Sequence, residues 1–165
     1  MTPGGRSLQD ELQQRRPFRS KREEFLLAVL RTAAVVRRPV LKIIEDRGIS
    51  LAQYNVLRIL RGAGEGGLPT LAIRERMIEE AAGITRLIDK LERAGYVRRE
   101  RDATDRRQVF CRITEAGLRL LTELDPVVST ATEATLAHLD DARIEALLAQ
   151  LAEVRAGICA PNEKW

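Results

Sequence analysis

The clearest pattern of hydrophobic and polar positions lies between residues 81 and 94. Four apolar residues recur at i, i+3, i+4 and i+7, which places them on one side of an α-helix: Ile84, Leu87, Ile88 and Leu91. We therefore predict a helix over 81–94 that buries this side and ends at Gly95. The opposite side is polar and carries Ala82, Thr85, Arg86, Asp89, Lys90 and Arg93.

The hydrophobic period changes from helical to two residues after Gly95. Residues 96–101 and 108–113 read as strands and flank a polar segment, Asp102–Arg107. Two such runs around a short polar loop are typical of a β-hairpin. We predict a hairpin whose loop carries several charges.

The segment before the amphipathic helix contains a helix-start signal. Ser50 followed by Gln53 has the spacing of a capping box, which predicts a helix beginning after Ser50. We expect Gly62 to end this helix and residues 62–69 to form a loop, because that stretch is rich in glycine. Residues 71–77 then predict a short helix.

The two ends of the chain are also helical by pattern. Residues 20–47 predict one helix, broken near Arg38 because the following proline cannot donate a backbone hydrogen bond. Thr114 is placed to cap a long helix that bends at Pro126, and Asp140 to cap a final helix.

These elements predict a mainly α protein with a small β-hairpin. A short helix, a turn, an exposed basic helix and a basic hairpin follow one another in the order of a winged helix-turn-helix. We divide the chain into a disordered basic arm at 1–20, an N-terminal helix at 21–47, the winged helix-turn-helix lobe at 48–114 and C-terminal helices at 115–160.

Composition adds little to this picture. The net charge is only +4, from 28 Lys and Arg against 24 Asp and Glu, so the distribution of charge matters more than its sum. Residues 1–20 lack the apolar core of a signal peptide, and no apolar run is long enough to cross a membrane. We expect a soluble, cytoplasmic protein.

No motif of catalytic or cofactor chemistry is recognisable. His138 is the only histidine and stands in no nucleophile motif, and no phosphate-binding loop or metal-ligand spacing is present. Cys111 and Cys159 lie far apart and match no metal or redox pair. We expect no enzymatic activity, no cofactor and no bound metal; a redox switch at Cys111 stays an alternative.

The basic helix and the hairpin together point to double-stranded DNA. The major groove of B-DNA admits one helix, whose first residues meet the base edges. We expect the polar helix side to enter this groove, with small residues at its start allowing close approach and the hairpin reaching the minor groove or phosphates. The candidate DNA-binding residues are Ala82, Gly83, Thr85, Arg86, Asp89, Lys90, Arg106 and Arg107.

The residues from about 25 to 155 resemble the MarR (multiple-antibiotic-resistance-regulator) family. The resemblance is strongest over Ile84–Arg99, and it continues through Asp105-Arg106-Arg107 and the Ile113-Thr114-Glu115-Ala116-Gly117 junction. It implies a homodimer formed by the N- and C-terminal helices, with Arg106 at the wing tip and Arg107 orienting the wing against Asp89. One departure is Glu79-Glu80-Ala81, where family members commonly start the recognition helix with Ser or Thr.

The resemblance also implies a regulatory mechanism. A MarR-type regulator binds a pseudopalindromic DNA operator as a dimer, and many release DNA when a small aromatic or anionic ligand binds. We therefore expect a repressor of this type, with an effector site that the sequence does not identify. A winged-helix protein-interaction module without DNA binding remains the main alternative.

Overall fold

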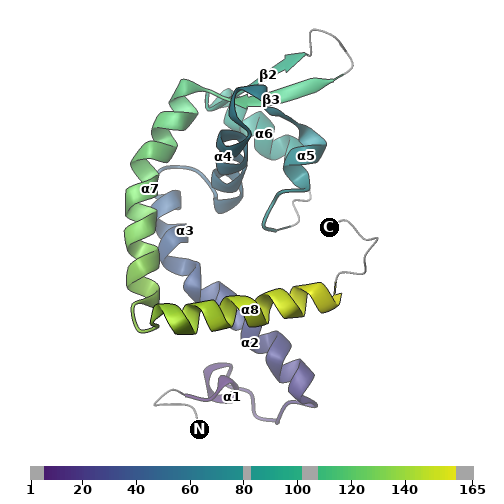
Figure 1. Ribbon diagram of the computed structural model, residues 1–165, viewed down its shortest axis with the longest axis vertical. Helices are drawn as coiled ribbons and strands as arrows, with labels where there is room; N and C mark the ends of the chain where they lie inside the picture. Colours follow the sequence, from purple (N-terminus) through teal and green to yellow (C-terminus); the bar gives the residue numbers. More distant parts are fainter. Residues whose placement is uncertain (1–5, 80–82, 102–107, 159–165) are drawn as a thin grey trace. The chain divides into compact units, whose positions relative to one another are not determined.

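The computed structural model describes residues 6–79, 83–101 and 108–158. The chain divides into two compact units, residues 1–39 and 40–165, and each is considered by itself. The described part is mainly helical with one small sheet, so the predicted fold class is confirmed (Figure 1). No helix in the described ranges is both long and apolar enough to span a bilayer.

The first unit contains a short helix and a long one. Helix α1 covers Leu8–Glu11 and α2 covers Lys21–Val36. Ser20 caps α2 by accepting a hydrogen bond from the Glu23 amide at 3.1 Å. The expected break is confirmed, because α2 ends at Val36 and α3 begins again at Arg38 and runs to Glu45.

Helix α4, Leu51–Ala63, forms the centre of the second unit. The capping box at its start is confirmed: the Gln53 amide donates to Ser50 Oγ at 3.2 Å, and the Ser50 amide donates to Gln53 Oε1 at 2.9 Å. The predicted end is wrong by two residues, because Gly62 lies inside the helix, which Gly64 terminates. Helical hydrogen bonding continues through Gly62 because an exposed glycine weakens a helix without ending it.

A third strand occupies part of the segment expected to be a loop. Strand β1, Leu68–Pro69, pairs with β3, Val109–Ile113, which also pairs with β2, Val97–Arg101. The sheet is antiparallel in the order β1-β3-β2. Pro69 is tolerated because β1 is an edge strand, where a missing amide donor leaves no ladder bond unmade. The predicted hairpin is thus confirmed and extended by one strand.

The core lies where α4, α6 and α7 meet the sheet. Helix α5 covers Thr70–Arg74, α6 covers Ile84–Arg93 and α7 covers Glu115–Leu136. Helix α4 packs against both α6 and α7. The fully buried side chains include Val56, Leu57, Leu60, Ile73, Ile88, Leu91, Leu121 and Leu124. This core fixes the inner side of α6 and leaves its other sides for solvent or a partner.

Helix α6 starts later than its apolar pattern predicts. Gly83 has φ +99°, a left-handed conformation outside the helix, so α6 begins at Ile84, three residues later than predicted. The end at Gly95 is confirmed. Gly95 donates to the Glu92 carbonyl and Tyr96 to the Leu91 carbonyl, both at 2.9 Å, which is a Schellman motif.

The last two helices are capped as predicted. Thr114 Oγ1 accepts a hydrogen bond from the Gly117 amide at 3.2 Å at the start of α7. Pro126 lies inside α7. Asp140 Oδ1 accepts from the Arg143 amide at 2.8 Å at the start of α8, which covers Asp141–Ile158.

Candidate nucleic-acid interface

Helix α6 has three distinct sides, because successive residues rotate by about 100° around its axis. The side facing the core carries Ile84, Ile88 and Leu91, all buried. The side facing solvent carries Arg86, Lys90 and Arg93, all exposed. A third side, facing strand β2, carries Thr85, Asp89 and Glu92. The sequence pattern alone separates only the first side from the other two.

The solvent side of α6 is purely cationic. No carboxylate in the described ranges pairs with Arg86 or Lys90, so both charges remain available to a ligand. Arg93 shares this side although it is not among the candidate residues. A helical projection of the sequence places Arg93 on the solvent side of α6. Nothing in the sequence pattern, however, distinguishes a DNA-binding arginine at the end of a helix from an ordinary solvated one. The result is a basic strip along the exposed length of α6.

The β2-facing side of α6 is held by one arginine of the wing. Arg99 Nη1 lies 2.7 Å from Glu92 Oε2, and Arg99 Nη2 lies 2.6 Å from Asp89 Oδ1. Nη2 also donates to the Thr85 carbonyl at 3.4 Å, and the Arg99 amide donates to Glu92 Oε1 at 3.1 Å. Partial burial lowers the pKa of Arg99, but the paired carboxylates outweigh it and leave that pKa raised. The guanidinium therefore stays charged.

This network changes the position expected for Asp89. The sequence predicts that its carboxylate faces DNA, but it points to Arg99 of the neighbouring strand. The pairing with Arg107 implied by the family resemblance stays a prediction, because Arg107 lies outside the described residues, as do Ala82 and Arg106. Neither Arg99 nor Glu92 is a candidate site residue by sequence. No periodic signal marks a contact between a strand and a helix seven residues away.

The remaining predicted residues lie at the start of α6. Gly83 is the exposed residue before the helix, and Thr85 is exposed in its first turn. The structure therefore brings Gly83, Thr85, Arg86 and Lys90 together along one stretch of α6.

The opposite face of the wing carries a second ion network. Glu100 forms ion pairs with two arginines: Arg98 Nη1 lies 2.9 Å from Oε1, and Arg112 Nε lies 2.8 Å from Oε2. One carboxylate thus holds two guanidinium groups on adjacent strands, which are register partners at Arg98 and Arg112. The net charge of this cluster is positive.

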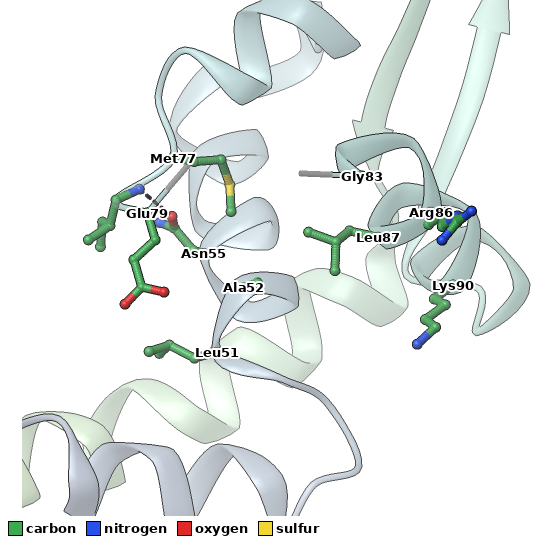
Figure 2. A pocket seen from close by; sticks show the side chains of 10 residues that line it. Leu51, Ala52, Asn55, Met77, Glu79, Gly83, Arg86, Leu87 and Lys90 are labelled. Atoms are coloured by element: carbon green, nitrogen blue, oxygen red, sulfur yellow. Dashed lines mark hydrogen bonds between the residues drawn. The ribbon is translucent and has the colours of Figure 1, made fainter. Parts of the chain in front are cut away.

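A pocket of about 480 Å³ opens beside the basic strip, between the first turns of α4 and α6. Figure 2 shows Leu87 directed into it from α6, Met77 above it, and Arg86 and Lys90 on the same helix. Its lining is mostly apolar, and Asn55 is fixed there because it accepts the Ile78 amide at 3.0 Å. Arg86, Lys90 and Glu79 are the charged residues of the lining, so the pocket combines apolar walls with two cations and one carboxylate.

Cys111 lies on the other side of the lobe, fully buried in strand β3. Burial raises the pKa of its thiol, against smaller opposing effects of the Thr70 hydroxyl and Arg99. The Thr70 Oγ1 atom is 3.9 Å from its sulfur. A buried thiol with a raised pKa is poorly reactive, so these observations do not favour a redox switch. The described residues contain no cluster of three or more metal-ligating side chains, and Cys159 lies outside them.

Comparison with known proteins identifies the family. The chain matches the MarR family model over residues 49–109. It is 33% identical over 132 residues to the HTH-type transcriptional regulator TtmR of Methylorubrum extorquens (strain PA1), a match that covers 80% of this chain and 66% of TtmR, just under two thirds of its length. A MarR transcription factor from Planctomyces limnophilus is 36% identical, with a TM-score of 0.62 over 84% of this chain and 99% of that one. The chain belongs to the MarR family of transcriptional regulators.

More distant structures share the fold. Sco3205 from Streptomyces coelicolor, solved in complex with DNA, has a TM-score of 0.74 at 18% identity and covers 92% of this chain and 98% of its own. CouR from Rhodococcus jostii RHA1, solved bound to p-coumaroyl-CoA, has a TM-score of 0.69 at 23% identity over 88% of this chain and 99% of CouR. At these identities the likeness establishes the winged-helix fold.

Proposed function

We propose that this chain represses transcription by binding a pseudopalindromic DNA operator as a homodimer, with α6 in the major groove. One observation carries the proposal: α6 buries one side in the core and presents on another a basic strip of Arg86, Lys90 and Arg93, which no carboxylate of the described residues pairs. Three exposed cations on one side of a helix create a positive potential that attracts an anionic partner such as DNA phosphates. The DNA complex of Sco3205 supports the same use of the fold.

Each side chain has a role consistent with its place. Thr85 and Arg86 lie in the first turn of α6, where recognition helices contact base edges, and an arginine can bind guanine through two parallel hydrogen bonds. Lys90 and Arg93 lie further along and suit phosphates. Gly83 lets the chain approach the groove closely. Ala82, Arg106 and Arg107 complete the proposed interface, with Arg106 in the minor groove.

The homodimer is supported by apolar surface on the terminal helices. On α8 the exposed fractions of Leu147, Leu148 and Ile158 are 44%, 59% and 61%, and α2 likewise exposes Phe25, Leu26 and Leu30. Exposed apolar stripes of this kind usually mark an association surface. We expect half-sites about one helical turn, or roughly 34–36 Å, apart on the operator.

Release of DNA by a small aromatic or anionic ligand is the regulation we propose. The pocket beside α6 has apolar walls, two cations and the Glu79 carboxylate, and CouR, a protein of this fold, was solved bound to p-coumaroyl-CoA. A ligand shifts the equilibrium only if it binds the DNA-free state more tightly. Ala52→Phe, which fills the pocket without changing charge, should abolish release by benzoate or 4-hydroxycinnamate and retain DNA binding.

The test is selection from a pool of randomised duplexes, followed by sequencing. We expect the wild type to enrich one inverted repeat and Arg86→Ala to lose that enrichment. Arg143→Ala, which removes one exposed helical arginine from α8, is the matched control and should retain it. Absence of enrichment at low salt by a folded dimer would overturn the proposal and favour a protein-interaction module.

A further inference from the structure

The Arg99 network joins the recognition helix to the wing at three successive turns. The Thr85 carbonyl, the Asp89 carboxylate and the Glu92 carboxylate all lie within 3.4 Å of a nitrogen of one guanidinium. They span seven residues of α6, or about 10 Å along its axis. The side chains of Arg99, Asp89 and Glu92 are 25%, 34% and 38% exposed, so the network is partly sheltered from water.

We propose that Arg99 is a positioning residue that sets the rotation of α6 about its own axis, and with it the sequence specificity of DNA binding. The inference rests on the proposed function, since it assigns how that interface is held. A single contact would let the helix turn about one point. Contacts at residues 85, 89 and 92 along one side resist both rotation and tilt, and they direct Arg86 and Lys90 away from β2.

The planar guanidinium is essential to this arrangement. Nη1 and Nη2 diverge to two different carboxylates, while the backbone amide of the same residue binds Glu92 a second time. A lysine carries the same charge at a single nitrogen and cannot span both carboxylates. Arg99→Lys therefore keeps the positive charge at residue 99 and removes the geometry that holds both carboxylates.

The sign of the effect distinguishes positioning from plain electrostatics. Glu92 is a negative charge on the helix proposed to face phosphates, so removing it should strengthen DNA binding if charge alone matters. If Glu92 positions the helix through Arg99, its removal should weaken binding to the selected operator. The two ideas predict opposite changes for one substitution.

The experiment compares Glu92→Ala with Glu100→Ala, and Arg99→Lys with Arg98→Lys. Glu100 and Arg98 form the ion network on the other face of the same wing, so each control changes an equivalent group outside the Arg99 network. We expect Glu92→Ala to bind the operator about fivefold more weakly than the wild type does, and to bind random duplex at least as tightly as the wild type. Glu100→Ala should retain the operator affinity of the wild type. Arg99→Lys should also bind the operator more weakly, whereas Arg98→Lys should match the wild type.

A second readout separates positioning from direct contact. The slope of log affinity against log salt decreases by about 0.9 for each phosphate that a variant no longer neutralises. Arg99→Ala should weaken operator binding at an unchanged slope. Three results would each overturn the positioning role. The slope for Arg99→Ala could decrease by this full amount, Glu92→Ala could bind the operator more tightly, or Arg99→Lys could bind the operator as well as the wild type.

The Arg99 network can also be tested without DNA. If the wild type selects no duplex, the proposed function fails, and amide hydrogen exchange of the free protein then decides the positioning role. Arg99→Ala should speed exchange of the α6 amides relative to Arg98→Ala, because α6 loses its attachment to β2. Equal exchange in the two variants would overturn the attachment itself.

Discussion

Gly117 is the position where one added methyl group should cost most in stability. It is a buried residue in the first turn of α7. A Cβ atom there would lie 2.5 Å from the Tyr96 carbonyl oxygen and 2.8 Å from Ile113 Cγ1. The carbonyl cannot turn aside, because it is backbone and already accepts the Thr114 amide at 3.0 Å. The start of α7 must therefore move away from strand β2.

The expected magnitude follows from two opposing effects. Overpacking of a core by a methylene or methyl group typically costs about 1–3 kcal/mol, and a contact with fixed backbone belongs at the upper end. Alanine returns up to about 1 kcal/mol through its higher helix propensity. We therefore expect Gly117→Ala to lower the free energy of unfolding by about 2 kcal/mol. For a chain of this length that corresponds to roughly 4–8 °C in Tm.

Urea unfolding followed by circular dichroism is the assay, at one fixed protein concentration because the stability of a protein that dimerises depends on its concentration. Gly62→Ala is the matched control: Gly62 is also helical, and an added Cβ would meet nothing within 4 Å. That variant should be as stable as the wild type or more stable. If Gly117→Ala were equally stable, the close packing of α7 against Tyr96 would not hold in solution.

Three further outcomes are expected. Lys90→Ala and Arg93→Ala should each weaken operator binding, as fluorescence anisotropy at several salt concentrations would show. If each side chain contacts one phosphate, the slope of log affinity against log salt should decrease by about 0.9 per protomer, or about 1.8 for the homodimer. Ser50→Ala should cost about 1 kcal/mol of unfolding free energy, because Ser50 caps α4; an unchanged urea midpoint would contradict this. Burial raises the pKa of Cys111 above its ordinary value of 9.0, so the folded state favours the neutral thiol. The buried neutral thiol contributes its full stability below a pH of about 9, and this contribution is lost as the pH rises further. In a Cys159→Ser background, the Tm of the Cys111→Ala variant should therefore fall less steeply above a pH of about 9 than the Tm of the protein that retains Cys111.

The sequence predicts best those elements whose pattern repeats over several turns. The apolar stripe of α6 and the caps at Ser50, Thr114 and Asp140 are all confirmed, because each depends on local chemistry that a few residues specify. Strand β1 is missed because two residues, one of them a proline, carry no periodic signal. Its pairing with β3 exists only through contacts between residues more than forty positions apart.

The candidate site shows the same division between local and long-range information. Helical periodicity places Arg86 and Lys90 on an exposed side, and the structure agrees. Periodicity places Asp89 among the exposed polar residues too, although it pairs with Arg99. Only the register of β2 against α6, set by the Gly95 turn, brings that arginine to the helix. The exposed half of the site is therefore readable from the sequence, and the paired half is not.

The base of the wing is closed by its own hydrogen bonds. Thr114 Oγ1 donates to the Gly95 carbonyl at 2.6 Å, and the Thr114 amide donates to the Tyr96 carbonyl. The end of α6 and the start of α7 thus meet at one junction that does not involve the far end of the hairpin. The end of α6 is in this sense fastened directly to the start of α7, although the whole hairpin lies between them in the sequence.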